Sequence, residues 1–227
     1  MKRETKLEEL KNINLFSNLT TEELIEIAQK IQIKSLIKGQ VVIYPEDTNE
    51  TFYAILKGKV KITKTDFSGK EIILAIHQSG DFFGELSVID GRTCPATAHA
   101  VESSTIALIA RDDFQHIIHN QTKVLNNLLF LMCSRLRDAW NVVEMLNFDN
   151  ASKRIKMFLL ISANKYGINN GDGITIKMKL THQDIAEMTG VTRETVTRIL
   201  NIWKKNKDLL ILDNKYIHLK NDFLKTL

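Results

Sequence analysis

The residues with the most specific chemistry lie in the segment 180–205, LTHQDIAEMTGVTRETVTRILNIWKK. Arg193 and Glu194 fall in the first turn of a predicted helix, and Arg198 falls about one turn further on. An arginine can bond the O6 and N7 atoms of guanine together, and a glutamate can accept a hydrogen bond from N4 of cytosine. A helix that enters the major groove by its N-terminus would bring these side chains to base edges.

The residues around this set predict a helix-turn-helix. Thr181 is expected to cap a first short helix, Gly190 stands where the turn needs a permissive backbone, and Thr192 is expected to cap the second helix. The opposite face of the second helix is apolar and consists of Val196, Ile199, Leu200 and Trp203. A merely solvated charged face is the alternative, but it leaves the glycine turn and the paired caps unexplained.

The charge of the chain is divided between its two parts. Residues 1–150 hold 17 Lys and Arg against 20 Asp and Glu, a net −3, whereas residues 151–227 hold 14 against 7, a net +7. A basic second part joined to an acidic first part indicates contact of the second part with a polyanion. Lys204, Lys205 and Lys207 are expected to attract the phosphate backbone whatever its sequence, or merely to add solubility.

The elements predicted for the basic part follow the order of a winged helix. A helix, ASKRIKMFLLISANKYG, is followed by the polar turn GINNGDG and the alternating strand ITIKMKL. The two helices described above come next, and the hairpin LLILDNKYIHL follows them.

The acidic part begins with two predicted helices and continues as β structure. Leu7, Leu10 and Ile13 recur at helical spacing, and Thr20 with Glu23 fits a capping box for the second helix. From Gly39 onward, glycines separate the short β-rich runs VVIY, TFYAIL, KVKIT, EIILAI and STIALIA. These runs predict a small antiparallel barrel or jelly roll, either filled by side chains or enclosing one small ligand. The fold class is therefore α+β.

A long helix without Gly or Pro is predicted over residues 122–147. Its apolar residues alternate steps of four and three, which predicts the seam of a homodimeric coiled coil. The seam residues are Leu125, Leu129, Met132, Leu136, Ala139, Val143 and Leu146. The alternative is one stripe packed on the chain's own core. Leu128, Leu131 and Trp140 lie off the seam and are expected to face the barrel.

Three domains follow: a sensor barrel with its N-terminal helices (1–119), a dimerisation helix with a hinge (120–149) and a DNA-binding domain (150–227). No apolar run reaches the roughly 18–20 residues needed to span a bilayer, and MKRETKLEEL lacks the apolar core of a signal peptide, so a cytoplasmic location is expected. Cys94 and Cys133 form neither a disulfide framework nor a CxxC pattern. No catalytic carboxylate pair, nucleophile motif or cluster of metal ligands is visible, which argues against an enzyme and against a metal site.

The order of barrel, long helix and winged helix, together with GVTRETVTRIL (190–200), resembles the cyclic AMP receptor protein and FNR family of bacterial transcription regulators. The resemblance implies that Arg193, Glu194 and Arg198 read a TGTGA half-site, that a homodimer reads a palindrome with half-sites about 34 Å apart, and that RNA polymerase is a further partner. Residues implied in phosphate or flanking contacts are Thr181, Gln183, Thr192, Thr195 and Thr197.

The same resemblance assigns residues 81–98, DFFGELSVIDGRTCPATA, to a phosphate cassette. Gly84, Glu85 and Leu86 match its first half, but the phosphate-binding arginine is replaced by Cys94 and the following serine by Pro95. The replacement removes a charge-assisted bond worth about 1.5–3 kcal/mol, and proline removes an N–H group. Arg92 would share a face with Cys94 if the segment were a strand, so it could substitute.

In the family's cyclic AMP site, a Thr-Ser pair on the long helix binds adenine; Ala139 and Trp140 stand at those places. These differences argue against cyclic AMP as the effector. The alternatives are another nucleotide or an anion bound through Glu85, Arg92 and Thr93, a pocket closed by Trp140, haem bound through His77, or a redox switch at Cys94. The candidate effector-binding residues are Gly84, Glu85, Leu86, Arg92, Thr93, Cys94 and Trp140.

Overall fold

The computed structural model describes residues 3–65, 69, 71–147, 150–213 and 215–225. The chain divides into two compact units, residues 1–134 and 135–227, and each is described by itself. None of the described helices is long and apolar enough to cross a membrane.

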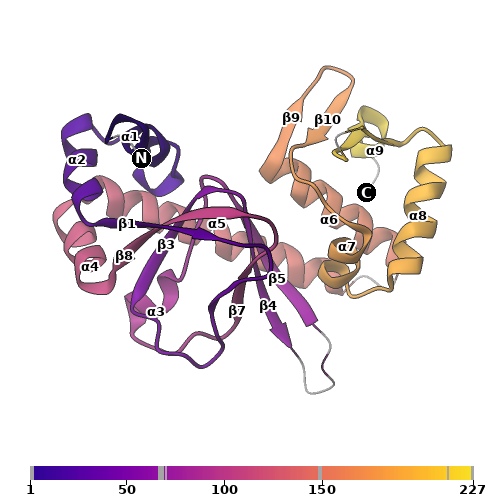
Figure 1. The fold of residues 1–227 in the computed structure, drawn as a ribbon. Helices are drawn as coiled ribbons and strands as arrows, with labels where there is room; N and C mark the ends of the chain where they lie inside the picture. Colours follow the sequence, from indigo (N-terminus) through magenta and orange to yellow (C-terminus); the bar gives the residue numbers. More distant parts are fainter. Residues whose placement is uncertain (1–2, 66–68, 70, 148–149, 214, 226–227) are drawn as a thin grey trace. The chain divides into compact units, whose positions relative to one another are not determined.

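The first unit contains two four-stranded antiparallel sheets, as expected for a jelly roll (Figure 1). One sheet has the order β1-β8-β3-β6 and the other the order β2-β7-β4-β5. The strands are β1 (Ile31–Leu36), β2 (Val41–Ile43), β3 (Thr51–Lys57), β4 (Lys59–Thr65), β5 (Glu71–Gln78), β6 (Phe82–Phe83), β7 (Thr97–Ala100) and β8 (Ser104–Ala110). The five β-rich runs predicted from the sequence correspond to β2, β3, β4, β5 and β8.

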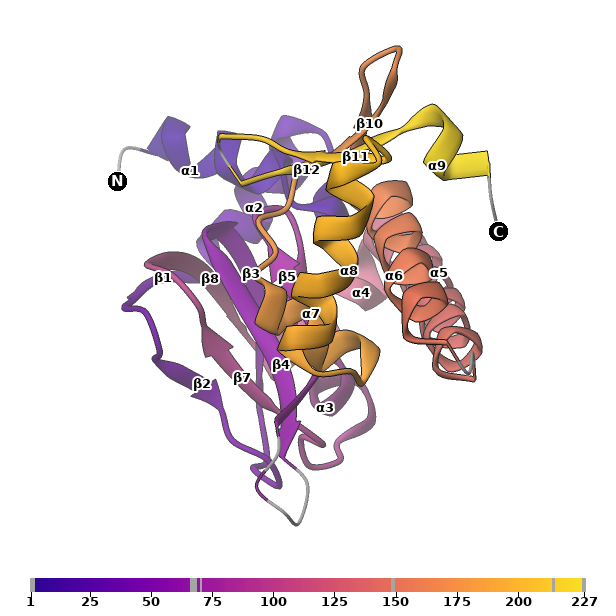
Figure 2. The ribbon, with the colours of Figure 1, turned by 90° about the vertical axis from the view of Figure 1, so that its right-hand side faces the viewer.

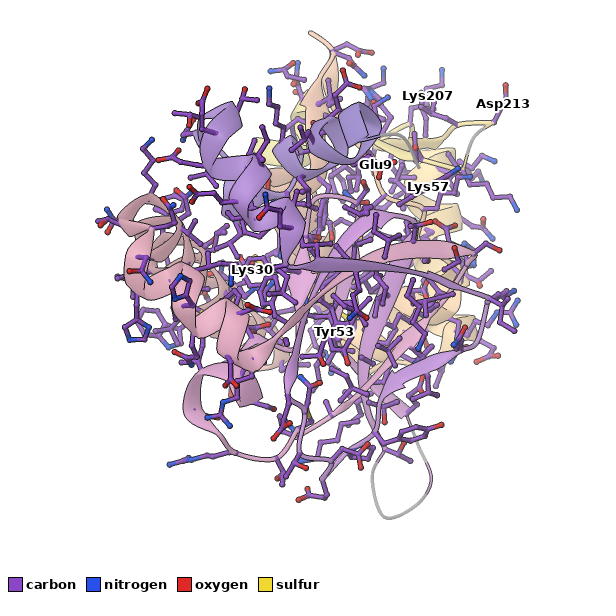
Figure 3. The ribbon with its side chains drawn as sticks, turned by 60° about the vertical axis from the view of Figure 1, so that its left-hand side comes forward. Glu9, Lys30, Tyr53, Lys57, Lys207 and Asp213 are labelled. Carbon is purple, nitrogen blue, oxygen red and sulfur yellow. The ribbon has the colours of Figure 1, made fainter. Side chains whose placement is uncertain are left out.

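Helices cover one side of the strands in this unit. They are α1 (Arg3–Lys11), the short 3-10 helix η1 (Asn14–Phe16), α2 (Thr21–Gln29), α3 (Glu85–Asp90), α4 (Arg111–Asn120) and the first half of α5 (Thr122–Leu146), which continues into the second unit. The predicted capping box of α2 is confirmed: the N–H of Thr20 donates to Glu23 Oε2 (2.6 Å), and the N–H of Glu23 donates to Thr20 Oγ1 (3.3 Å). Lys30, labelled in Figure 3, follows the other end of α2. Its Nζ lies 2.6 Å from Asp113 Oδ1 on α4.

Two buried clusters hold the first unit together. One lies between the helices and β1, β3 and β8, where Phe52 stacks on Phe114 with a centroid distance of 4.2 Å. The other fills the space between the sheets and includes Tyr53, Phe83 and Cys94, with Tyr53 and Phe83 stacked at 4.9 Å. Apolar side chains therefore line the interior of the barrel next to the predicted cassette.

The long helix α5 is present and has two kinds of apolar surface. Leu128 is buried in the helix-covered cluster and Leu131 packs against it, as predicted, but the predicted seam residue Met132 packs there as well. The other large apolar seam residues, Leu125, Leu129, Leu136, Val143 and Leu146, are 36–60% exposed in the single chain. Trp140 was expected to face the barrel; instead it is 63% exposed.

The second unit has α6 (Ala151–Tyr166), β9 (Gly167–Asn169), β10 (Gly173–Ile176), α7 (His182–Thr189), α8 (Arg193–Lys205), β11 (Leu209–Ile211), β12 (Ile217–Lys220) and α9 (Asn221–Lys225). Its sheet has the order β11-β12-β10-β9. The segment GINNGDG was predicted to be only a turn, but its first three residues form β9, which pairs with β10. β10 also ends at Ile176, earlier than the predicted strand. The sheet and α7–α8 confirm the winged helix.

Candidate DNA-binding site and sensor pocket

The helix-turn-helix is positioned by the local signals that the sequence carries. Thr181 caps α7 in a capping box, in which its Oγ1 accepts from the N–H of Asp184 (3.0 Å) and its own N–H donates to Asp184 Oδ2 (2.9 Å). Gly190 has φ +65°, the left-handed conformation that ends α7 and favours glycine. Thr192 caps α8 by accepting from the N–H of Thr195 at 3.2 Å.

Helix α8, drawn in orange in Figure 2, carries the predicted base readers on one face and core residues on the other. Arg193, Glu194 and Arg198 are all exposed. Val196, Ile199 and Leu200 are buried on the other face, while Trp203 is half-buried and meets Phe223 edge-on at a centroid distance of 5.0 Å. The buried face fixes the rotation of the helix, so the three charged side chains project together from the unit.

The candidate phosphate contacts differ in how their polar atoms are engaged. Thr192 and Thr195 are joined through their hydroxyl groups at 3.0 Å, and Gln183 Nε2 donates to Glu187 Oε1 at 2.6 Å. Thr197 Oγ1 lies 2.8 Å from Nδ1 of His182 and donates to the carbonyl of Arg193 at 2.9 Å.

Sequence reasoning missed residues that support the turn between the two helices. Nη1 of Arg154, on α6, donates to the carbonyl of Thr189 at 3.3 Å. A Cβ atom at Gly190 would lie 3.5 Å from Arg154 Nη1 and 3.8 Å from Leu146 Cδ2, so the end of α5 also reaches this turn. Only the folded unit reveals these contacts, because the partners are distant in sequence.

The start of the cassette is tightly packed. Gly84 has φ +81°, and a Cβ atom there would lie 2.8 Å from Cδ2 of Tyr53 and 2.9 Å from the carbonyl oxygen of Thr51. Glu85 is buried in the first turn of α3, whereas Leu86 is exposed. The hydroxyl of Tyr53 donates to Asn49 Oδ1 at 3.2 Å, and burial raises the pKa of this phenol.

The second half of the cassette does not follow the predicted strand. Cys94 is buried and its N–H donates to the carbonyl of Asp47 at 3.0 Å. Arg92 points away, with 86% of its side chain exposed and its Nε 4.0 Å from Asp90 Oδ2. The expectation that Arg92 and Cys94 share a face was wrong, because residues 91–96 form a loop to which the two-residue alternation of a strand does not apply. Thr93 Oγ1 donates to Glu46 Oε2 at 3.3 Å.

His77, the candidate haem ligand, is a buried residue of β5. Its Nδ1 lies 3.9 Å from Oδ2 of Asp81, four residues later in the same segment. Within the described part of the chain, no three or more His, Cys, Asp or Glu side chains gather in a way that could hold a metal ion.

The base of the wing carries an ionic cluster centred on Asp172. Lys220 Nζ donates to Asp172 Oδ2, and His218 Nε2 lies 3.3 Å from Asp172 Oδ1. Nδ1 of the buried His218 lies 2.9 Å from Thr175 Oγ1 on β10. The hydrogen bond from Lys220 holds the pKa of Asp172 below its ordinary value.

Each of the two units contains a segment that matches a known protein family. Residues 33–121 match the family "Cyclic nucleotide-binding domain", and residues 153–221 match "Crp-like helix-turn-helix domain". The chain is 33% identical to the global nitrogen regulator of Synechococcus elongatus over 193 residues, which are 84% of this chain and 86% of that protein. It is 30% identical to the cyclic AMP receptor protein of Thermus thermophilus over 192 residues, 85% and 86% of the two chains.

Solved structures show the same fold. A CooA mutant from Carboxydothermus hydrogenoformans has a TM-score of 0.73 at 23% identity, with 90% of this chain and 88% of that chain covered. FixK2 from Bradyrhizobium japonicum has a TM-score of 0.72 at 23% identity, with 84% and 93% covered. The chain belongs to the cyclic AMP receptor protein and FNR family of transcription regulators. It is an effector-controlled DNA-binding regulator, and this class of protein is not enzymatic.

Proposed function

We propose that the protein acts as a homodimer that binds a palindromic TGTGA-like site through Arg193, Glu194 and Arg198. The observation that carries this proposal is the exposure of all three side chains on α8 while the other face of the helix is buried. Two arginines and one glutamate match the acceptors of guanine and the donor of cytosine in the major groove. Bound at such a site, the protein would act on RNA polymerase.

The exposed apolar residues of α5 support the dimer. Leu129, Leu136 and Val143 are 52–60% exposed in the single chain and recur every seven residues along the helix. A stripe of this length is costly to leave in water, and a second copy of the same helix would cover it. The symmetry of such a dimer would pair two recognition helices with two inverted half-sites.

The contacts around Gly190 connect the end of α5 with the turn before α8, so a change in α5 would alter DNA binding. Leu146 ends α5 and lies beside the turn, while Arg154 holds the carbonyl of Thr189 before it. A shift at the end of α5 would therefore move the turn that sets the start of α8. Loss of alignment would remove base contacts and leave the weaker attraction to phosphates.

The effector of this regulator is not held in the manner of cyclic AMP. Where the cassette of the family carries its arginine, Cys94 is buried against Ser87, and the guanidinium of Arg92 points into solvent beside Asp90. A phosphate beside Cys94 would therefore receive a charge-assisted bond neither from the residue at that place nor from Arg92 in this conformation.

Binding of a duplex with inverted TGTGA repeats tests the DNA part of the proposal. At fixed salt, the full-length protein is expected to bind it at least 1,000-fold more tightly than a scrambled duplex in one effector state. Equal affinity for the two duplexes in every effector state would refute the assignment. Calorimetric titration with cyclic AMP tests the second part, and a dissociation constant in the micromolar range would overturn it.

A further inference from the structure

We propose that His182 determines the specificity of α8 by acting through Thr197, whose hydroxyl it restricts to accepting hydrogen bonds from DNA. The proposal rests on the DNA-binding function above and identifies a residue outside the predicted base readers. His182 is the first residue of α7, and Thr197 lies in the second turn of α8 between Val196 and the predicted reader Arg198. The two side chains connect the two helices of the motif.

The distances fix the direction of each hydrogen bond. Thr197 Oγ1 lies 2.9 Å from the carbonyl oxygen of Arg193, and a carbonyl oxygen can only accept, so the hydroxyl hydrogen of Thr197 is directed there. His182 Nδ1 lies 2.8 Å from the same Oγ1. Because the single hydroxyl hydrogen is already used, Nδ1 must carry a hydrogen and donate. His182 is therefore the Nδ1–H form whenever its ring is neutral.

This arrangement limits what Thr197 can recognise. A hydroxyl group has one donor and two lone pairs, of which the donor and one lone pair are occupied within the motif. The oxygens of phosphate, and O6 and N7 of guanine, only accept, so Thr197 cannot bond them while the network is intact. The remaining lone pair can accept from N6 of adenine or N4 of cytosine, and the methyl group can contact that of thymine.

His182 is thus a positioning residue, and Thr197 is the residue that meets the base pair. Without the donor on His182, only the hydrogen bond to the Arg193 carbonyl holds the Thr197 rotamer, so other rotamers are populated more often. Some of those rotamers would direct the hydroxyl hydrogen toward acceptors on DNA. Discrimination at one base pair of each half-site would fall, while the phosphate contacts and the salt dependence of binding would stay the same.

Selection from a pool of duplexes with a randomised stretch tests the proposal in the full-length protein, because the wild type then reports its own motif. His182→Asn is the matched control, since its Nδ2–H group takes the place of Nδ1–H. Wild type and His182→Asn are expected to enrich the same motif. His182→Ala and Thr197→Val are expected to lose roughly tenfold discrimination at the same base pair. If His182→Ala does not fold, Thr197→Val still tests the proposal.

An unchanged motif in His182→Ala, a uniform loss of affinity at all positions, or failure of His182→Asn to restore the motif would each overturn the proposal. Long-range proton–nitrogen NMR of the free protein gives a reading that needs no DNA. The Nδ1–H form of His182 is expected in the wild type and its loss in Thr197→Val, and an Nε2–H form in the wild type would contradict the network. If the wild type enriched no motif, the proposed DNA function would fail, while the NMR result would still decide the state of His182.

Discussion

The Sγ atom of Cys94 lies 3.0 Å from the Oγ atom of Ser87, and both side chains are buried. This contact fastens the loop before β7 to helix α3. Two backbone hydrogen bonds hold the same loop on its other side. The N–H of Cys94 donates to the carbonyl of Asp47, and the carbonyl of Cys94 accepts from the N–H of Glu46 at 2.8 Å. A thiol held in this way is part of the packing of the barrel.

Thiol labelling distinguishes packing from a redox switch at Cys94. Cys133 is exposed in the single chain and Cys94 is buried, so a Cys133→Ser variant is expected to show no fast labelling in its folded state. Its remaining thiol should react only at the rate of unfolding, measured in parallel by urea-induced fluorescence change. Rapid modification of folded Cys133→Ser would instead support a sensing role for Cys94.

Arg198 is expected to carry sequence preference. Arg198→Ala should weaken binding to the TGTGA-type palindrome by about 1–3 kcal/mol and relax the preference at one guanine per half-site. Fluorescence anisotropy against duplexes substituted at each position measures both effects. Lys204→Ala is the matched control on the same helix: it should lower affinity equally for all duplexes and reduce the salt dependence. Unchanged specificity in Arg198→Ala would contradict the assignment.

The heptad pattern of α5 predicts which of its exposed apolar residues lie in the dimer interface, whereas exposure alone does not distinguish them. Leu136→Asp places a charge on the seam and is expected to convert the dimer to a monomer at micromolar concentration, as measured by analytical ultracentrifugation. Phe130 is even more exposed, at 72%, but lies off the seam. Phe130→Asp should therefore leave the dimer intact, and equal dissociation of both variants would argue against a coiled-coil seam.

Two glycines with similar backbone conformations have different surroundings. Gly84 and Gly39 have φ +81° and +84°, but a Cβ atom at Gly39 would meet no atom within 4 Å. Alanine at either position should cost about 1–2 kcal/mol for the left-handed backbone. Gly84→Ala should cost about 1–3 kcal/mol more, because its Cβ would overlap Tyr53 and Thr51. Urea unfolding measures the loss in free energy of unfolding of each variant. Equal losses would show that Tyr53 and Thr51 move aside for the added Cβ atom.

The ion pair at the base of the wing predicts an acid-dependent contribution to stability. The pKa of Asp172 is lowered by the hydrogen bond from Lys220, so the folded state favours the ionised carboxyl. This contribution is complete above the ordinary value of 3.8 and is lost as the pH falls through the lower folded pKa. NMR titration should show the pKa of Asp172 rising in Lys220→Gln, and no rise would exclude Lys220 as the main cause.

Local signals in the sequence identified the parts of the fold that depend on neighbouring residues. The capping box of Thr20 and Glu23 and the caps at Thr181 and Thr192 all formed, because each needs only residues three positions apart. Strand β9 was missed because its residues are exposed and it is held by backbone pairing with β10, which leaves no hydrophobic pattern.

The candidate sites were harder to predict where they depend on tertiary contacts. The exposed charges of α8 followed from helical periodicity, but the bond between His182 and Thr197 joins two helices. Arg92 was misplaced because strand alternation was applied to a loop. The loop at residues 91–96 was therefore hard to predict, since the conformation of a loop depends on its contacts more than on its sequence pattern.

Helix α5 contributes to the interiors of both units. Val124 and Leu128 are buried in the first, and Met145 is completely buried in the second. A recombination point within this helix would join halves whose core residues evolved with different neighbours. A chimera that exchanges sensors between relatives and keeps α5 whole from the sensor's parent should therefore take residue 145 from the parent of the second unit, because Met145 is buried there.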